Sequence, residues 1–178
     1  MEAAVYEFKA NGFADTAVAD IMDTAGLGVG TFYNYFGSKE EVLMAIVKER
    51  FKQVELKVKA LANNNSPTLK LLEFCSMSTA RLIDENRFIL PMFGSAIERA
   101  DKPEKLPKNI SPEFKKIFED IISRGQSLKE IRGDIPVDII SEMFHSIYQA
   151  AALSKLEIPF QENIRLKVKV LLDGIKND

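Results

Sequence analysis

Cysteine, histidine and tryptophan are almost absent from this sequence of 178 residues. Cys75 is its one cysteine, His145 its one histidine, and it has no tryptophan. A single cysteine cannot form an internal disulfide, and one histidine cannot build a histidine-rich metal site. We therefore expect no disulfide scaffold, no metal or other cofactor and no enzyme. Cys75 lies in an apolar run, where a small buried residue is expected rather than a nucleophile.

Long hydrophobic runs and an excess of positive charge are missing too. No uninterrupted apolar run approaches the roughly 18–20 residues that span a bilayer, and the N-terminus has neither a basic start nor a cleavable apolar segment. These absences predict a cytoplasmic protein without a membrane partner. The formal net charge is −2, so no global basic field announces a nucleic-acid partner. Such a partner has to be argued from local residues.

The residues that are present favour a packed helical protein. Hydrophobic residues make up 46% of the chain and charged residues 28%, as in ordinary globular proteins. Apolar residues recur at helical spacing in nearly every long segment, and no stretch alternates strictly at period two, which predicts an all-α fold. Gly12 and Gly26 are placed to end helices, and Pro91 to kink one. The expected helices cover residues 2–11, 16–24, 38–62, 67–85, 87–100, 111–128, 136–156 and 161–176.

Residues 12–43 show helix-turn-helix spacing. A short helix from Thr16, a suitable N-cap, ends at Gly26, and a glycine-containing segment over 28–36 follows. Ser38 and Glu41 form a capping box that starts a long helix of about 37 Å. The short segment projects from the body, as a helix that enters the major groove does. Phe32 and Phe36 are expected on the inner side of this segment. The residues expected to face outward, with hydroxyl and amide groups that suit DNA contacts, are Thr31, Tyr33, Asn34 and Tyr35.

Lys39 stands in the first turn of the long helix. A positive charge is unfavourable at a helix N-terminus, because the helix dipole is positive there. An outside anion, namely a DNA phosphate, would explain this lysine.

Residues 12–43 read G-F-x-x-T-x-V-x-D-I-x-x-x-A-G-L-x-x-G-T-F-Y-x-Y-F-x-S-K-E-E-V-L. This pattern resembles the DNA-binding domain of tetracycline-repressor-type (TetR family) transcriptional regulators. The resemblance implies an all-α, Ω-shaped homodimer, with a three-helix DNA-binding head over 1–46 and a regulatory and dimerisation domain over 47–178. It also implies phosphate contacts from Thr16 and Lys39 and close backbone approach at Gly30. The full set of expected DNA contacts is Thr16, Gly28, Gly30, Thr31, Tyr33, Asn34, Tyr35 and Lys39.

The charge distribution leaves an alternative open. Residues 1–46 hold two lysines against seven acidic residues, whereas residues 48–59 hold five basic residues against two acidic ones. The leading interpretation is a repressor that binds operator DNA and is released by a small apolar effector. The alternative is a helical small-molecule-binding or protein-interaction module with a vestigial helix-turn-helix. A gel shift with duplex DNA distinguishes the two.

The last two helices are expected to form a homodimer. Residues 136–156 have more apolar circumference than a one-sided surface helix needs, and small residues near 150–152 permit close helix approach. The alternative is a helix buried within one subunit. The expected interface residues are Ile140, Ile147, Ala151, Val168, Leu171 and Leu172.

The C-terminal domain is expected to hold the effector. Large flexible and aromatic side chains are dense on three of its segments, and a helix kinked at Pro91 packs less evenly than a regular one. The alternative for each residue is ordinary core packing. The expected pocket residues are Phe74, Met77, Phe88, Met92, Phe93, Phe114, Phe118, Phe144, His145 and Tyr148.

Overall fold

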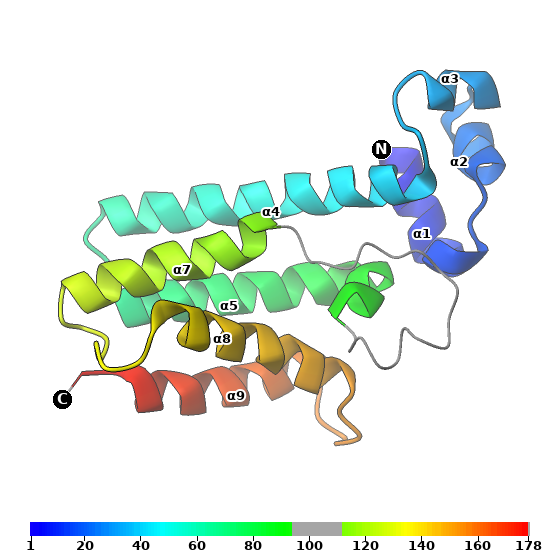
Figure 1. Cartoon of the computed structure of the whole chain (residues 1–178). Helices are drawn as coiled ribbons and strands as arrows, with labels where there is room; N and C mark the ends of the chain where they lie inside the picture. The colour runs from blue at the N-terminus through cyan, green and yellow to red at the C-terminus, as the bar shows by residue number, and fades with distance from the viewer. Residues whose placement is uncertain (94–111, 178) are drawn as a thin grey trace.

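The structure is a computed structural model that describes residues 1–93 and 112–177, and the side chains of 1–90 and 114–177. Every regular element in these ranges is a helix, which confirms the all-α prediction. A small head of three helices sits at one end of a bundle, the body, and one long helix runs from the head along the body (Figure 1). The elements are α1 (Glu2–Asp15), α2 (Val18–Ala25), α3 (Val29–Tyr33), α4 (Lys39–Asn63), α5 (Thr68–Glu85), the 3-10 helix η1 (Arg87–Phe93), α7 (Pro112–Ser127), α8 (Val137–Ala152) and α9 (Phe160–Ile175).

The glycines of the head end helices as the sequence predicts. Gly12 has φ 80° and breaks α1, leaving one short turn beyond it. Gly26 is left-handed, with φ 67°, and ends α2. The N-cap prediction at Thr16 is wrong, because the cap of α2 is Ala17. The Ala17 N–H donates to the Asp20 carboxylate at 2.7 Å, so that carboxylate supplies the cap that the alanine side chain lacks.

Helix α4 joins the head to the body without a break. Ser38 caps it, its hydroxyl accepting the Glu41 N–H at 3.3 Å. The Glu41 carboxylate accepts the Gly37 N–H at 2.8 Å, one residue before the cap itself. Its 25 residues make a rod of about 37 Å, as expected. The boundary that we expect at 46/47 falls inside this rod, so head and body share one rigid helix.

The body packs α4, α5, α7, α8 and α9 around a common interior. Helix α5 contacts α4, α7 and α9, and η1 touches α1, α5 and α8. The expected α-helix over 87–100 is a 3-10 helix over the part that is described. Its remainder and the loop expected over 101–112 fall largely outside the described residues. None of the described helices is both long and apolar enough to cross a membrane.

The first turn of α5 is held by residues near the end of α7. Pro67 is its N-cap and offers no side-chain hydrogen bond. The Glu130 carboxylate accepts the Thr68 N–H instead, and Arg124 donates to the Thr68 hydroxyl at 3.0 Å. Gly125 lies against the same threonine, since a Cβ there would stand 2.6 Å from Thr68 Cγ2 and 2.6 Å from Ile131 Cδ1. The missing local cap is therefore supplied through tertiary contacts.

Candidate nucleic-acid interface and regulatory core

Helix α3 and the turn that follows it present polar and aromatic groups to solvent. Tyr33 is 58% exposed and Tyr35 77% exposed, and Asn34 is exposed beside them. Thr31 is half-buried. Phe32 is buried, as expected, and fixes this five-residue helix to the head. The exposed set can donate and accept hydrogen bonds at base edges and phosphates.

The two glycines of this segment leave its surface open. Gly28 is the N-cap of α3, and Gly30 lies within the helix. A Cβ at either position would meet nothing within 4 Å. Neither glycine is therefore required by packing inside the chain, and both leave room for another molecule to approach the backbone.

Lys39 does not point to an outside anion. Its ammonium donates to the carbonyl oxygens of Phe13, Ala14 and Thr16 at 2.7, 2.8 and 3.0 Å. Its Nζ also lies 4.7 Å from the centre of the Phe13 ring. These carbonyls end α1, where a cation is favourable. The prediction of a phosphate contact is corrected, because all three ammonium donors are used to tie α4 to α1.

Thr16 is likewise turned inward. Its side chain is 1% exposed, and its hydroxyl donates to the Gly12 carbonyl at 2.6 Å. The phosphate contact that the resemblance implies is therefore not available to this hydroxyl, which closes the break in α1 instead.

A buried carboxylate, which the sequence analysis missed, joins α1 to α2. Glu7 is 8% exposed, and its two oxygens accept hydrogen bonds from Thr24 and, at 2.9 Å, from Asn11. Buried charges need such partners. The only sequence signal is an acidic residue at helical spacing from Ala4 and Phe8, both of which lie in the head core.

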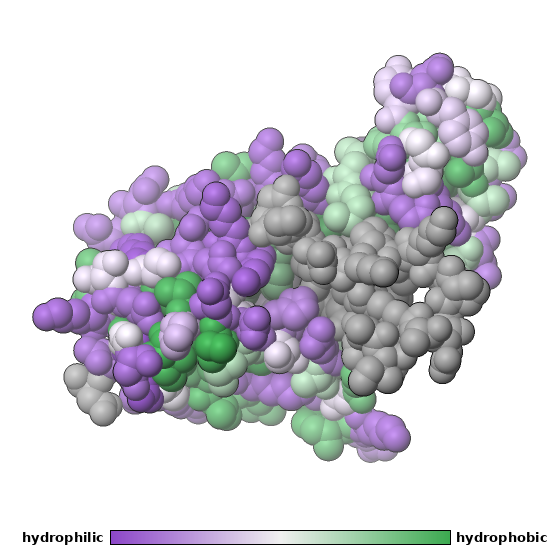
Figure 2. Space-filling view, viewed as in Figure 1, coloured by the Kyte–Doolittle hydropathy of each residue, from purple (hydrophilic) through white to green (hydrophobic). Residues whose placement is uncertain are grey.

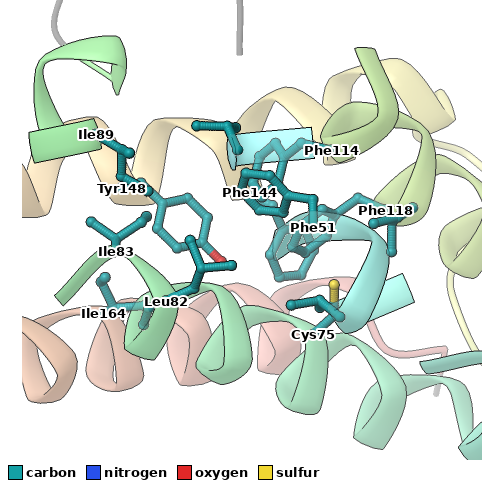
Figure 3. Close-up of a cluster of buried hydrophobic side chains, with 14 of the residues drawn as sticks. Phe51, Cys75, Leu82, Ile83, Ile89, Phe114, Phe118, Phe144, Tyr148 and Ile164 are labelled. Carbon is teal, nitrogen blue, oxygen red and sulfur yellow. The ribbon is translucent and has the colours of Figure 1, made fainter. Parts of the chain in front are cut away.

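Aromatic rings from three helices meet inside the body (Figure 3). Phe114 of α7 lies 5.0 Å from Phe51 of α4, 5.1 Å from Phe118 and 5.6 Å from Tyr148 of α8, between ring centres. Phe118 stacks on Phe144 at 5.0 Å. We call these five residues the aromatic cluster. It unites four of the expected pocket residues, and His145 lies at its edge, 6.1 Å from Phe114.

Polar groups adjoin the aromatic cluster on α5. The Tyr148 hydroxyl donates to the Ser76 carbonyl at 3.1 Å. The hydroxyls of Ser76 and Thr79 are buried and make no hydrogen bond of normal geometry with any described residue. Burial raises the pKa of the Cys75 thiol far above its ordinary value, so the thiol stays protonated. Cys75 is thus a small buried residue, as expected.

The other expected pocket residues lie elsewhere. Phe88 packs on Phe8 of α1, 5.5 Å between ring centres, and so connects body to head. Phe74 and Met77 are half-buried at the edge of the core. Met77 shares its helix face with Asp84, which accepts a hydrogen bond from Gln161 of α9. Met92 and Phe93 fall outside the described side chains.

Comparison with known proteins agrees with this geometry. Residues 1–46 match the family model described as bacterial regulatory proteins, tetR family. The chain is 25% identical over 178 residues to the HTH-type transcriptional repressor DhaR of Mycobacterium sp. (strain GP1), covering 96% of this chain and 89% of that one. It also resembles the FadR regulator of Bacillus subtilis, solved in complex with stearoyl-CoA, at a TM-score of 0.75 with 19% identity, over 98% of this chain and 96% of that one. The lauroyl-CoA complex of Thermus thermophilus FadR is similar at a TM-score of 0.72 with 19% sequence identity. The match covers 97% of this chain and 91% of that one.

Residues 1–46 thus form a TetR-family DNA-binding domain, and the chain as a whole is similar to TetR-type transcriptional regulators. It is accordingly a DNA-binding transcriptional regulator with an N-terminal helix-turn-helix and a helical C-terminal domain. The head described above is the part that matches the family model.

The predicted dimer-interface residues face the core of their own chain. Five of the six are at most 8% exposed in the single chain, and Leu172 is half-buried: Ile140, Ile147, Ala151, Val168 and Leu171 are the buried five. The prediction is wrong for the buried five, for which the alternative of burial within one subunit holds, and for Leu172 it stays a prediction. Because α8 is apolar on two faces, the sequence did not reveal which face turns inward.

The second apolar face is exposed. On α8, Ile139 is 48% and Met143 46% exposed, and Leu153 follows at the helix end. On α9, Leu166 and Val170 are exposed. Figure 2 shows hydrophobic surface over the start of α8 and near the turn between α8 and α9. We call these five residues the outer apolar face. Their pattern is only partly readable in the sequence: Ile139 and Met143 are four residues apart, as are Leu166 and Val170.

Proposed function

We propose that this chain is a cytoplasmic repressor that binds operator DNA through α3 and leaves it when a small lipophilic ligand enters the body. The aromatic cluster carries this proposal, because it adjoins the Ser76 and Thr79 hydroxyls, which have no normal hydrogen-bond partners among the described residues. A mainly apolar lining with a few polar groups is typical of ligand sites. The relatives support the same function, since DhaR is a repressor and the two FadR structures hold acyl-CoA. The proposal includes no catalytic step.

The chemistry of the cluster favours a neutral, apolar ligand or ligand tail. No acidic or basic side chain belongs to the cluster, and its rings offer flat apolar surface. A buried hydroxyl without a partner costs about 1–3 kcal/mol. A carbonyl or ester oxygen of the ligand would accept from these hydroxyls and remove that cost. A fatty acyl chain with its thioester carbonyl fits this description.

Two routes connect such a ligand with the head. Ile89 of η1 lies beside Tyr148 (Figure 3), and its neighbour Phe88 packs on Phe8 of α1. Phe51 belongs to α4, whose first residue, Lys39, is bonded to the end of α1. A ligand that moves Tyr148 therefore acts on the head through η1, and one that moves Phe51 acts on it through α4. Coupling of about 1–3 kcal/mol between ligand and operator is typical.

Selection of duplexes from a random pool tests DNA binding and reports half-site spacing. We expect paired half-sites about one DNA turn, ~34–36 Å, apart. Tyr33→Ala and Tyr35→Ala are expected to weaken the selected operator about tenfold or more, measured by fluorescence anisotropy. Leu128→Ala, an exposed change on the body, serves as the control and leaves affinity unchanged. Absence of any enriched duplex would favour the interaction-module alternative.

A thermal-shift screen with acyl-CoA thioesters of increasing chain length tests the ligand site. Ligands that stabilise the fold are expected to lower operator affinity by about five- to 150-fold. Ser76→Ala is expected to weaken ligand binding without changing the affinity of the ligand-free protein for its operator. Ser123→Ala, on the exposed side of α7, is the matched control. Stabilisation that leaves operator affinity unaltered contradicts the switch.

The outer apolar face is the proposed homodimer surface. Its residues lie on the neighbouring helices α8 and α9. Ala150, an exposed small residue of α8, allows close approach of a second copy. Met143→Glu combined with Val170→Glu is expected to give a monomer in sedimentation equilibrium at micromolar concentration. Lys169→Glu, exposed on α9 outside this face, is expected to leave the dimer intact. A monomeric unmodified chain would remove this proposal.

A further inference from the structure

A groove of about 330 Å³ lies between α1, α4 and α5, away from both sites described above. Val54 and Leu82 are its buried apolar residues, and its rim comes from three helices. Figure 1 shows α4 and α5 running side by side, with α1 at their head end. The volume is in the range of small-molecule sites, roughly 300–1,000 Å³. The groove therefore has room for more than a single ion.

The rim is strongly basic. Lys9 of α1, Arg50 and Lys57 of α4, and Arg81 of α5 line it, against one acidic residue, Glu85. None of the four basic side chains makes an ion pair or side-chain hydrogen bond with a described residue. Four positive charges set against one negative charge repel one another, and a bound polyanion would relieve that repulsion. This basic rim includes part of the basic stretch over 48–59, which DNA binding through α3 does not use.

A buried acceptor lines the same groove. Asn86 is 5% exposed and donates through Nδ2 to the Leu82 carbonyl at 2.8 Å. Its Oδ1 has no hydrogen-bond partner among the described residues. A buried amide oxygen needs a donor, such as a hydroxyl or an N–H group. The groove thus combines sites for several negative charges with one for a hydrogen-bond donor.

The groove is not part of the DNA-binding surface. Lys57 stands 18 residues after Lys39 on α4, which places it about 27 Å along the helix from the head. It is also distinct from the aromatic cluster, because Phe51 points into the cluster whereas its neighbour Arg50 lines the groove. Its occupant is therefore a separate anionic molecule or the anionic part of a larger ligand.

We propose that this groove binds a small molecule with two or more phosphate groups and a hydrogen-bond donor, that is, a nucleotide headgroup. Arg50, Lys57 and Arg81 hold the phosphates, and Asn86 accepts from the base or sugar. Lys9 brings the head into the same site, so the occupied groove fixes α1 relative to α4 and α5. The headgroup belongs either to a free nucleotide or to the coenzyme A part of an acyl thioester.

Isothermal titration of the full chain with ATP, coenzyme A and lauroyl-CoA tests the proposal. The variant Arg50→Ala/Arg81→Ala is expected to bind at least about tenfold more weakly than the unmodified chain, because charge-assisted hydrogen bonds to phosphate are lost. All of the substituted side chains are exposed, so the fold is retained. Lys52→Ala/Lys70→Ala removes two exposed charges from the same helices outside the groove and is expected to change affinity less than about twofold.

The three probes separate the two sources. ATP binding as tightly as coenzyme A supports a free nucleotide, and binding of coenzyme A and lauroyl-CoA without ATP supports an acyl thioester headgroup. The proposal is overturned when none of the three probes binds the unmodified chain. It is also overturned when Arg50→Ala/Arg81→Ala binds every such probe as tightly as the unmodified chain does. Groove binding does not depend on the proposed function. A chain that binds coenzyme A here but binds no duplex contradicts the proposed function alone.

Discussion

Buried polar side chains join the helices of the head around a small apolar core, whereas a cluster of aromatic rings fills the interior of the body. Three polar side chains hold the head helices together: Lys39 bonds α4 to the end of α1, Thr16 closes the break in α1, and Glu7 joins α1 to α2. In the body, the Ser76 and Thr79 hydroxyls lie inside and make no normal hydrogen bond with a described residue. The head turns its functional groups outward, whereas the body keeps hydroxyl groups within, near the Tyr148 hydroxyl.

This difference follows from what each part has to recognise. A head that docks on a rigid duplex needs a fixed shape and an exposed set such as Tyr33 and Tyr35. A body that admits a small molecule needs an interior that can open, with few polar groups to orient the guest. Changes made in one part are therefore expected to leave the other part unaffected.

Removal of one ring from the aromatic cluster is expected to have the largest effect. Phe144 is fully buried and stacks on Phe118. Phe144→Ala removes that ring and leaves a cavity, which typically costs about 3–5 kcal/mol of unfolding free energy. Urea denaturation followed by circular dichroism measures it. Tyr33→Ala, on the surface of the head, is the comparison, and a loss of similar size there would erase the contrast between the two parts.

A methyl group added to the body is expected to cost about 1–3 kcal/mol. The Cβ of Gly125→Ala would stand 2.6 Å from Thr68 Cγ2, and both Thr68 and Ile131 are buried and cannot move aside freely. The same substitution at Gly133, which has nothing within 4 Å of a Cβ, is the control. If Gly125→Ala and Gly133→Ala have equal unfolding free energies, the first turn of α5 moves aside at little cost and the prediction is wrong.

Loss of the Lys39 ammonium is expected to loosen the head alone. Lys39→Met keeps the apolar stem but removes three hydrogen bonds to the end of α1, at a cost of about 1–3 kcal/mol. Native-state hydrogen exchange should show faster exchange in α1 and α2 and unchanged protection in α8. Lys52→Met on the exposed side of α4 is the control. If Lys39→Met weakens operator binding while hydrogen exchange in α1 and α2 is unchanged, the interpretation of Lys39 as a phosphate contact is correct instead.

The smallest expected change in stability comes from lowering the pH until the Glu130 carboxylate is protonated. The hydrogen bonds from Thr68 hold the pKa of Glu130 below its ordinary value of 4.5. This contribution is therefore present above about pH 4.5 and is lost as the pH falls through the lowered pKa. Because the carboxylate is partly exposed, solvent screening keeps the contribution below about 1 kcal/mol. Thermal unfolding of the unmodified chain and of Glu130→Gln between pH 3 and 7 should differ least at the acid end.

The sequence by itself determined the helical fold, the glycine breaks at Gly12 and Gly26, the Ser38 cap and the exposed tyrosines of the α3 segment. Gly12 and Gly26 end helices through their own positive φ values, and Ser38 caps α4 from within one turn. The inward Phe32 and outward Tyr33 follow from helical spacing. These features were predictable because each depends on residues within about one turn of the chain.

Only the tertiary structure decided which distant groups meet. Lys39 reaches Phe13 across 26 residues, and Glu130 caps α5 across 62. The inward face of α8 could not be read, because both its faces are apolar and only the packing of α7 and α9 selects one. The basic groove needs α1, α4 and α5 side by side. A one-dimensional pattern records what a residue is and what lies one turn away, but the packing of helices fixes the partner of each charge and of each apolar face.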